Sequence, residues 1–97
     1  MKTLPEIERI LKGLKPILRE NFKVKEIGIF GSFVRGEQKE TSDLDLLVEF
    51  IEPIGLIKYA SLQNFLSDRV GAQVDLITKL GLKPKISEQV SKEVVYL

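Results

Sequence analysis

The sequence predicts an α/β (α+β) fold in which helices cover a small mixed sheet of three or four strands. Three observations lead to this prediction. The chain has 97 residues, 43% of them are hydrophobic, and the apolar residues alternate between helical spacing and strand spacing along the chain. This length accommodates one domain of ordinary size, so we expect residues 1–97 to form a single domain.

The first predicted helix covers about residues 4–21. Thr3 and Glu6 fit a capping box at its start. Apolar residues then recur at helical spacing, namely Ile7, Ile10, Leu11, Leu14 and Leu18. Pro16 lacks the backbone N–H that a helix interior requires, so we expect it to kink or split this helix.

The following segments predict a strand, a short helix and a second strand. The pattern favours a strand over residues 24–30 that ends at Gly31, then a helical turn over 32–35 that is closed by Gly36. A polar loop follows over residues 37–41. Strict alternation over residues 43–50 predicts a strand with a mixed second face; one face carries Leu44, Leu46, Val48 and Phe50, and the other carries Asp43, Asp45, Leu47 and Glu49.

The rest of the chain predicts a helix over residues 56–70 that stops at Gly71, and a third strand over residues 73–78. Pro84 opens a last helix, in which apolar residues lie four apart at positions 86, 90 and 94. Residues 94–97 fit the end of that helix and fit a short edge strand equally well, so the pattern leaves both open.

The composition excludes several classes of protein. The 15 basic and 14 acidic residues give a net charge of +1, which excludes a strongly basic nucleic-acid binder, so we expect no direct contact with nucleic acid. Cysteine and histidine are absent, which excludes disulfide scaffolds, Ser-His-Asp catalysis and Cys/His zinc sites. The apolar runs are too short for a signal peptide or a membrane span, so we expect a cytoplasmic protein.

The charged residues are unevenly distributed along the chain. Between positions 9 and 25, Glu20 is the only acid among Arg9, Lys12, Lys15, Arg19, Lys23 and Lys25. This segment predicts a solvated helix face, with binding to an acidic partner as the alternative. Between positions 37 and 52, Lys39 is the only base among Glu37, Glu40, Asp43, Asp45, Glu49 and Glu52. Because like charges repel, we expect a cation to bind there.

Two neighbouring motifs indicate phosphate chemistry. Gly31 lets the backbone approach a ligand closely, and the amides that follow it can hold phosphate oxygens together with the Ser32 hydroxyl. Arg35 lies one helical turn further on. Asp43 and Asp45 are two apart in a strand, so both point to one side with Cα atoms about 6.5 to 7 Å apart. They can share a pair of Mg²⁺ ions roughly 4 Å apart.

Asp75 can join these two acids if its strand lies beside that of Asp45. It would then be placed to take a proton from an attacking hydroxyl group in an in-line phosphoryl transfer. Each candidate also has a purely structural interpretation. Gly31 and Ser32 can form a plain turn, Arg35 can pair with Asp43 or Glu37 at the surface, and Asp75 can simply face solvent.

Together these residues resemble the motif of the polymerase-beta-like nucleotidyltransferases, which has Gly-Ser, a nearby basic residue, Asp-x-Asp and a later lone acid. The segments GSFVRGE at 31–37 and SDLDLLVEF at 42–50 are similar to the minimal nucleotidyltransferase branch. The resemblance implies a nucleotidyltransferase fold. It also implies that Gly31 and Ser32 bind the nucleotide phosphates with support from Arg35, that Asp43 and Asp45 bind Mg²⁺, and that Asp75 completes the acidic triad.

Members of this branch are small prokaryotic proteins usually encoded beside a HEPN-domain toxin, a ribonuclease. They act as antitoxins that transfer AMP from ATP to a tyrosine of the toxin. The resemblance therefore implies a Mg²⁺-dependent adenylyltransferase, with ATP as substrate and a HEPN toxin as partner. It leaves open a homo-oligomer and a hetero-oligomer with the toxin.

Two other functions stay open at this point. One is a non-catalytic, nucleotide-binding antitoxin that neutralises the same partner by occlusion. Three clustered acids favour the enzyme over this module, because a pure binder does not need them. The other is transfer to a small molecule such as an aminoglycoside. Larger relatives use additional domains to bind such acceptors, and we expect no such domain here.

Overall fold

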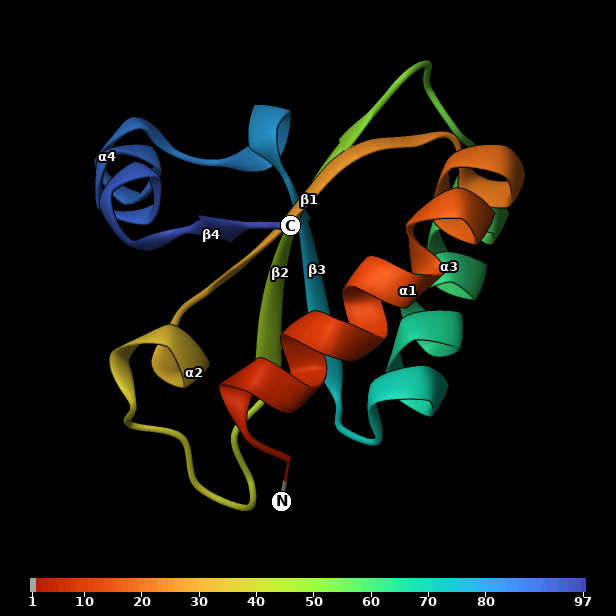
Figure 1. Ribbon diagram of the computed structural model, residues 1–97. Coiled ribbons are helices and arrows are strands. Elements are labelled where there is room, and N and C mark those ends of the chain that lie inside the picture. Colours follow the sequence, from red (N-terminus) through yellow and green to blue (C-terminus); the bar gives the residue numbers. More distant parts are fainter. Residues whose placement is uncertain (1) are drawn as a thin grey trace.

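The computed structural model describes residues 2–97 and confirms a small mixed sheet covered by helices (Figure 1). The predicted elements occur in the predicted order, and a short 3₁₀ helix that was not predicted follows β3. The elements are α1 (Leu4–Phe22), β1 (Val24–Phe30), α2 (Ser32–Arg35), β2 (Leu44–Phe50), α3 (Leu56–Val70), β3 (Val74–Thr78), the 3₁₀ helix η1 (Lys79–Gly81), α4 (Pro84–Glu93) and β4 (Val95–Tyr96). Their bounds agree with the predicted ones to within a few residues.

The strand order brings the end of β1 and the starts of β2 and β3 to the same end of the sheet. In the described residues the strands lie in the order β3-β2-β1-β4, with β1 antiparallel to β2 and β4, and β2 parallel to β3. Phe30 at the end of β1 pairs with Asp45 near the start of β2, and Leu44 pairs with Val74 at the start of β3. The turn after β1 and the first residues of β2 and β3 therefore meet.

The main hydrophobic core lies between the sheet and the helices α1 and α3, which run on the same face (Figure 1). Leu44, Leu46 and Val48 of β2 are buried in it, as their alternation predicted. The rings of Phe22 and Phe65 meet there with centroids 5.5 Å apart, where the two helices pack together. This face of β2 therefore has a structural role.

The opposite face of the sheet is covered by α4 over a smaller core. Phe30, Leu47 and Val90 are buried together there. This explains why Leu47 alternates with acids on the second face of β2. The structure also decides between the two alternatives for residues 94–97, because the helix ends at Glu93 and β4 follows it as an edge strand beside β1.

Pro16 does not split the first helix, so that part of the prediction is wrong. Residues 4–22 are one continuous helix with Pro16 inside it. Leu11 and Leu14 before the proline and Leu18 after it are all buried in the main core. Packing on both sides of Pro16 therefore holds the helix together, although the proline removes one backbone hydrogen bond.

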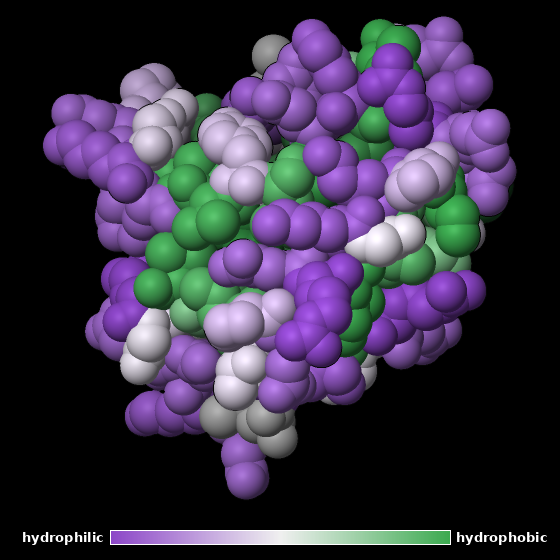
Figure 2. Space-filling model, viewed as in Figure 1, coloured by the Kyte–Doolittle hydropathy of each residue, from purple (hydrophilic) through white to green (hydrophobic). Residues whose placement is uncertain are grey.

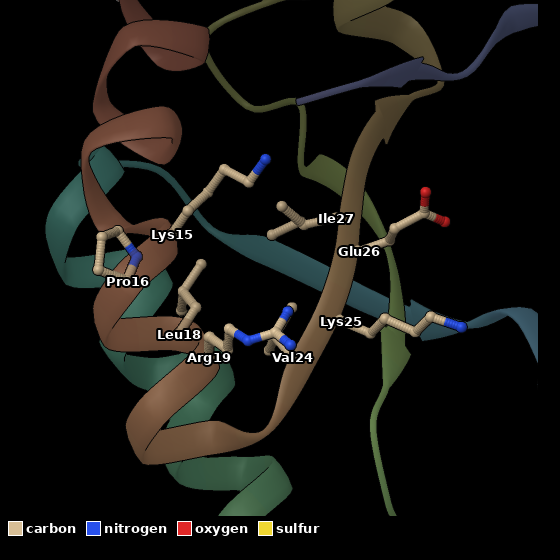
Figure 3. A pocket seen from close by; sticks show the side chains of 8 residues that line it. All are labelled: Lys15, Pro16, Leu18, Arg19, Val24, Lys25, Glu26 and Ile27. Atoms are coloured by element: carbon tan, nitrogen blue, oxygen red, sulfur yellow. The ribbon is translucent and has the colours of Figure 1, made fainter.

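The face of the molecule shown in Figure 2 is mostly hydrophilic. On this face, hydrophilic side chains surround smaller apolar areas. A groove of about 260 Å³ lies between α1 and β1, with Lys15, Arg19 and Lys25 among its lining residues (Figure 3). These cations belong to the predicted basic segment, and all three are exposed. Among the helices of residues 2–97, none combines the length and the apolar character that crossing a membrane requires.

Candidate functional site

The turn between β1 and α2 is built around Gly31. Its φ is +81°, a conformation that residues with a side chain rarely adopt. Its carbonyl oxygen accepts hydrogen bonds from the backbone N–H of Val34 at 3.1 Å and of Arg35 at 3.2 Å. Gly36, with φ of +73°, ends the short helix. The predicted strand, turn and helical turn are therefore confirmed, and Ser32 is the first residue after the turn.

Gly31 also makes room for the second acid of the Asp-x-Asp motif. A Cβ at this position would lie 2.1 Å from Oδ2 of Asp45 and 3.0 Å from its Cγ. A side chain at position 31 would have to displace the Asp45 carboxylate. The Asp45 carboxylate therefore lies directly against the backbone of the turn, and the two motifs that were separate in the sequence form one site.

The three acids lie at the same end of the sheet, at the starts of β2 and β3. Asp45 on β2 and Asp75 on β3 are register partners in adjacent parallel strands, so the condition that the sequence analysis set for Asp75 is met. Asp43 lies just before β2, next to Leu44, whose N–H donates to the carbonyl oxygen of Gln73 at 2.8 Å. Asp43 and Asp75 are exposed, whereas Asp45 is half-buried.

The local electrostatics reflect this crowding. Burial, the negative charge of Asp75 and that of Asp43 together raise the pKa of Asp45 to about 6, and the nearby Arg35 cation opposes this shift. A carboxylate whose pKa is raised by like charges is one that a bound cation stabilises. The site thus carries the excess of negative charge that the acidic segment predicted.

The donor chemistry of these acids fits Mg²⁺, which prefers carboxylate oxygens. In the side-chain positions that residues 2–97 adopt here, no three acids come close enough together to hold a metal ion. Asp43 and Asp75 are exposed, so their carboxylates can turn toward a cation bound beside Asp45. The metal-binding role of the three acids stays a prediction.

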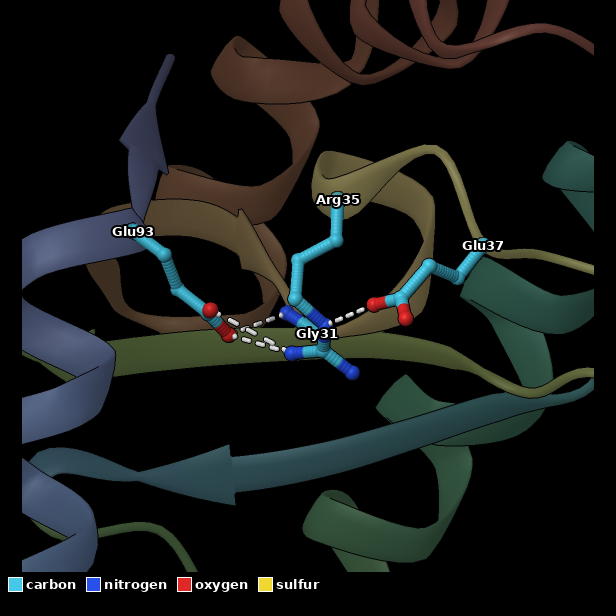
Figure 4. A network of polar contacts seen from close by, with 4 residues as sticks. All are labelled: Gly31, Arg35, Glu37 and Glu93. Carbon is cyan, nitrogen blue, oxygen red and sulfur yellow. Dashed lines mark hydrogen bonds and ion pairs between the residues drawn. The ribbon is translucent and has the colours of Figure 1, made fainter.

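Arg35 is held by two carboxylates (Figure 4). Its Nε donates to Glu37 at 2.5 Å, and its Nη1 donates to both oxygens of Glu93, at 3.0 and 3.2 Å. Hydrogen bonds to Glu37 and then to Glu93 raise the pKa of Arg35 above its ordinary value. Of the two surface partners considered from the sequence, Glu37 is present, and Asp43 makes no ion pair with Arg35.

Glu93 is the residue of this site that the sequence analysis missed. Besides Arg35, it accepts a hydrogen bond from the backbone N–H of Gly31 at 2.9 Å. It reaches the turn because β4 pairs with β1 at Ile29 and Val95, so that the antiparallel register places residue 93 opposite residue 31. A sequence reading with β4 as an edge strand beside β1 could have found this contact.

The chain is similar to known proteins along its whole length. The model of the nucleotidyltransferase domain family matches residues 11–97. The protein adenylyltransferase MntA of Thermococcus cleftensis is 52% identical over 97 residues, which cover 100% of this chain and 98% of the relative. Identity at this level supports the same fold.

Solved structures are similar as well. A structure provisionally described as a minimal nucleotidyltransferase has a TM-score of 0.74 at 35% identity, and the match covers 96% of this chain and 90% of that one. A crystal structure of a toxin-antitoxin with AMP-PNP has a TM-score of 0.72 at 26% identity, covering 93% of this chain and 70% of that one.

Proposed function

This chain belongs to the nucleotidyltransferase domain family, and from that membership we propose that it transfers AMP from ATP to a tyrosine hydroxyl of a HEPN-domain toxin and so acts as the antitoxin. The similarity to a protein adenylyltransferase supports a protein as the acceptor. The similarity to a toxin-antitoxin with AMP-PNP supports a toxin as the partner and ATP as the donor.

One observation carries this proposal. The Asp45 carboxylate lies against Gly31 of the turn and beside its register partner Asp75 on the neighbouring strand. A glycine turn that approaches phosphates and a group of acids that binds cations are the two parts that phosphoryl transfer requires. Sites with only a structural purpose do not crowd unpaired acids together, because the crowding is unfavourable.

The chemistry is an in-line displacement at the α-phosphorus of ATP. The acceptor oxygen forms a bond to that phosphorus while the bond to the oxygen of the β-phosphate breaks, and pyrophosphate leaves. Gly31, Ser32 and Arg35 hold the phosphates, and the exposed carboxylate of Asp75 takes the proton of the acceptor hydroxyl. The product is a tyrosine joined to AMP through a phosphodiester.

Asp43, Asp45 and Asp75 would hold the Mg²⁺ ions, of which we expect two. Bound there, Mg²⁺ neutralises the charge that develops on the phosphate oxygens. The three acids concentrate negative charge at one end of the sheet, where the Mg²⁺ ions would bind. Since ATP is the donor, we place the reaction in the cytoplasm, and we expect a hetero-oligomer of the chain and the toxin.

The decisive experiment incubates the protein with the product of the neighbouring gene, ATP and Mg²⁺. We expect mass spectrometry to find the partner heavier by whole AMP units, attached to a tyrosine. The double variant Asp43→Asn, Asp45→Asn should transfer nothing. Asp68→Asn on α3 is a matched control, because Asp68 is exposed and lies outside the site, and it should transfer AMP as the unchanged protein does.

Two results would reject the enzymatic proposal. If the toxin is inhibited without any change in its mass, or if the double variant inhibits it equally well, the protein neutralises its partner by occlusion. If AMP is found only on a small molecule such as an aminoglycoside, the acceptor class is wrong while the nucleotidyltransferase chemistry stands.

A further inference from the structure

The C-terminal end of α4 reaches the turn after β1. Glu93 is the last residue of this helix, and 17% of its side chain is exposed. Its carboxylate accepts hydrogen bonds from the Gly31 N–H and from Nη1 of Arg35 (Figure 4). Glu93 therefore joins the C-terminal segment to the two groups on the turn that the proposed function assigns to nucleotide phosphates.

The hydrogen bonds of Arg35 leave one part of its guanidinium group available. An arginine carries five N–H donors in a planar fork. Glu37 takes Nε and Glu93 takes Nη1, whereas Nη2 makes no hydrogen bond within residues 2–97. With two sides of the plane held, the group cannot rotate freely, and Nη2 keeps one direction.

That direction matters because Arg35 lies near the acids. Glu93 joins Nη1 of Arg35 to the N–H of Gly31, and the Asp45 carboxylate lies against the same glycine. A phosphate bound between the Gly31 turn and the acids lies within reach of the same cation. An arginine held in place loses less conformational entropy on binding a phosphate than a free one.

The position of Glu93 depends on a close approach between β1 and the C-terminal segment. A Cβ at Gly28 would lie 2.6 Å from Cγ2 of Val94 and 3.2 Å from Cδ1 of Tyr96. The absence of a side chain at Gly28 thus lets residues 94–96 pack closely against β1. Val90, buried on the sheet, fixes the helix before them.

We propose that Glu93 is a positioning residue of the nucleotide site, which anchors Arg35 against the Gly31 turn so that Nη2 of Arg35 is directed at a phosphate of ATP. This proposal rests on the proposed function, since it concerns the same site. It adds a contribution from the C-terminal helix, which lies outside the Gly-Ser and Asp-x-Asp motifs.

The test is a double-mutant cycle on ATP binding, measured by isothermal titration with Mg²⁺ present. Glu93→Gln keeps the shape of the side chain and removes its charge, and it should weaken ATP binding about tenfold, the effect of one charge-assisted hydrogen bond. In an Arg35→Ala background the same substitution should change binding less than twofold, because Glu93 acts through Arg35. In AMP transfer, KM for ATP should rise in step with Kd.

Controls separate positioning from general stability. Glu88→Gln is matched, because Glu88 lies on the same helix but is exposed and pairs with Lys92 at 3.8 Å, and it should leave ATP binding unchanged. Urea denaturation of each variant shows whether binding changes without loss of the fold. A structural role of Glu93 would weaken binding by the same factor with and without Arg35.

The outcomes distinguish this proposal from the proposed function. If the unchanged protein binds no ATP, the proposed function fails, and this proposal fails with it. If the unchanged protein binds ATP and Glu93→Gln binds it equally well, only the positioning role fails. If Glu93→Gln binds ATP more tightly, Glu93 competes with the phosphate, which also overturns the positioning role.

Discussion

The carboxylate of Asp45 occupies the space that a side chain at position 31 would need, since a Cβ on Gly31 would lie 2.1 Å from Oδ2 of Asp45. This contact links the turn after β1 to the acids at the start of β2. It makes Gly31 necessary for two separate reasons, its φ of +81° and the lack of space. Any substitution there strains the backbone and displaces an acid of the proposed metal site.

Gly31→Ala should therefore destabilise the protein by about 1 to 3 kcal/mol and abolish ATP binding. Gly13→Ala is the control, because Gly13 lies inside α1 and a Cβ there would meet nothing within 4 Å. It should stabilise the protein by about 0.5 to 1 kcal/mol through the better helix propensity of alanine. Urea denaturation and titration calorimetry measure both effects. Normal ATP binding by Gly31→Ala would contradict the packing described here.

The raised pKa of Asp45 predicts how stability depends on pH without metal. Its pKa is about 6 in the folded protein, against 3.8 for an ordinary aspartate. Between these values the folded state keeps a proton that the unfolded state has lost, so the contribution of Asp45 to stability falls as pH rises from about 4 to about 6 and then levels off.

Asp45→Asn removes this contribution and should be more stable than the unchanged protein at pH 7 in EDTA. A shift of two pKa units corresponds to roughly 3 kcal/mol for a fully buried group, and solvent screening of this half-buried side chain reduces it to about 1 kcal/mol. The gain should disappear below about pH 4. The measurement is urea denaturation at several pH values. A less stable variant at pH 7 would show that Asp45 is a structural acid, and the metal site built on it would be withdrawn.

Leu46→Ala tests the other face of the same strand. Leu46 is fully buried in the main core, so its truncation should cost about 2 to 5 kcal/mol through lost burial and a residual cavity. The folded fraction should still transfer AMP, because the leucine faces away from the acids. Denaturation in EDTA and AMP transfer with Mg²⁺ are measured for both Leu46→Ala and Asp45→Asn. Asp45→Asn should show the reverse pattern, with no loss of stability and no AMP transfer.

Mg²⁺ and ATP together should raise the melting temperature, because a ligand that binds only the folded state stabilises it by mass action. ATP with EDTA should have a much smaller effect, since the crowded acids then repel the phosphates. Asp45→Asn should lose most of the Mg²⁺-dependent increase. Thermal melts with millimolar ATP measure this. An equal increase with and without EDTA would exclude the acids as the metal site.

Gly28→Ala should loosen the C-terminal segment without touching the acids. Its Cβ would lie 2.6 Å from Val94, so residues 94–96 must move away from β1. Amide hydrogen exchange should then become faster at Leu97, whose N–H donates to the carbonyl oxygen of Ile27 at 3.0 Å. Unchanged protection of that amide would show that the segment accommodates the methyl group.

Local patterns in the sequence predicted most of the fold and the acids of the site. The alternation over residues 43–50 assigned Leu44 and Leu46 to the core, and the structure buries both. The resemblance to a known motif indicated Gly31 and the acids, and β3 does lie beside β2 with Asp75 paired to Asp45. The core face of β2 could be predicted because it depends on neighbouring residues alone, whereas the roles of Gly31 and the acids stay predictions.

The errors and omissions have a common physical cause. Pro16 was expected to interrupt a helix on local grounds, and packing of both halves on one core prevents the split. Glu93 was missed because its contact with Gly31 joins residues 62 apart in the chain. That contact depends on the pairing of β4 with β1, which a two-residue strand does not reveal by periodicity.

The distance in sequence between Gly31 and Glu93 also sets an order of assembly. The Gly31 turn and the acids Asp43, Asp45 and Asp75 all lie within residues 24–78, the segment that runs from β1 to the end of β3. A chain growing from the ribosome presents these residues before α4 exists, and contacts between distant residues form late in folding. The acids can therefore come together beside the Gly31 turn before Glu93 is available to hold Arg35.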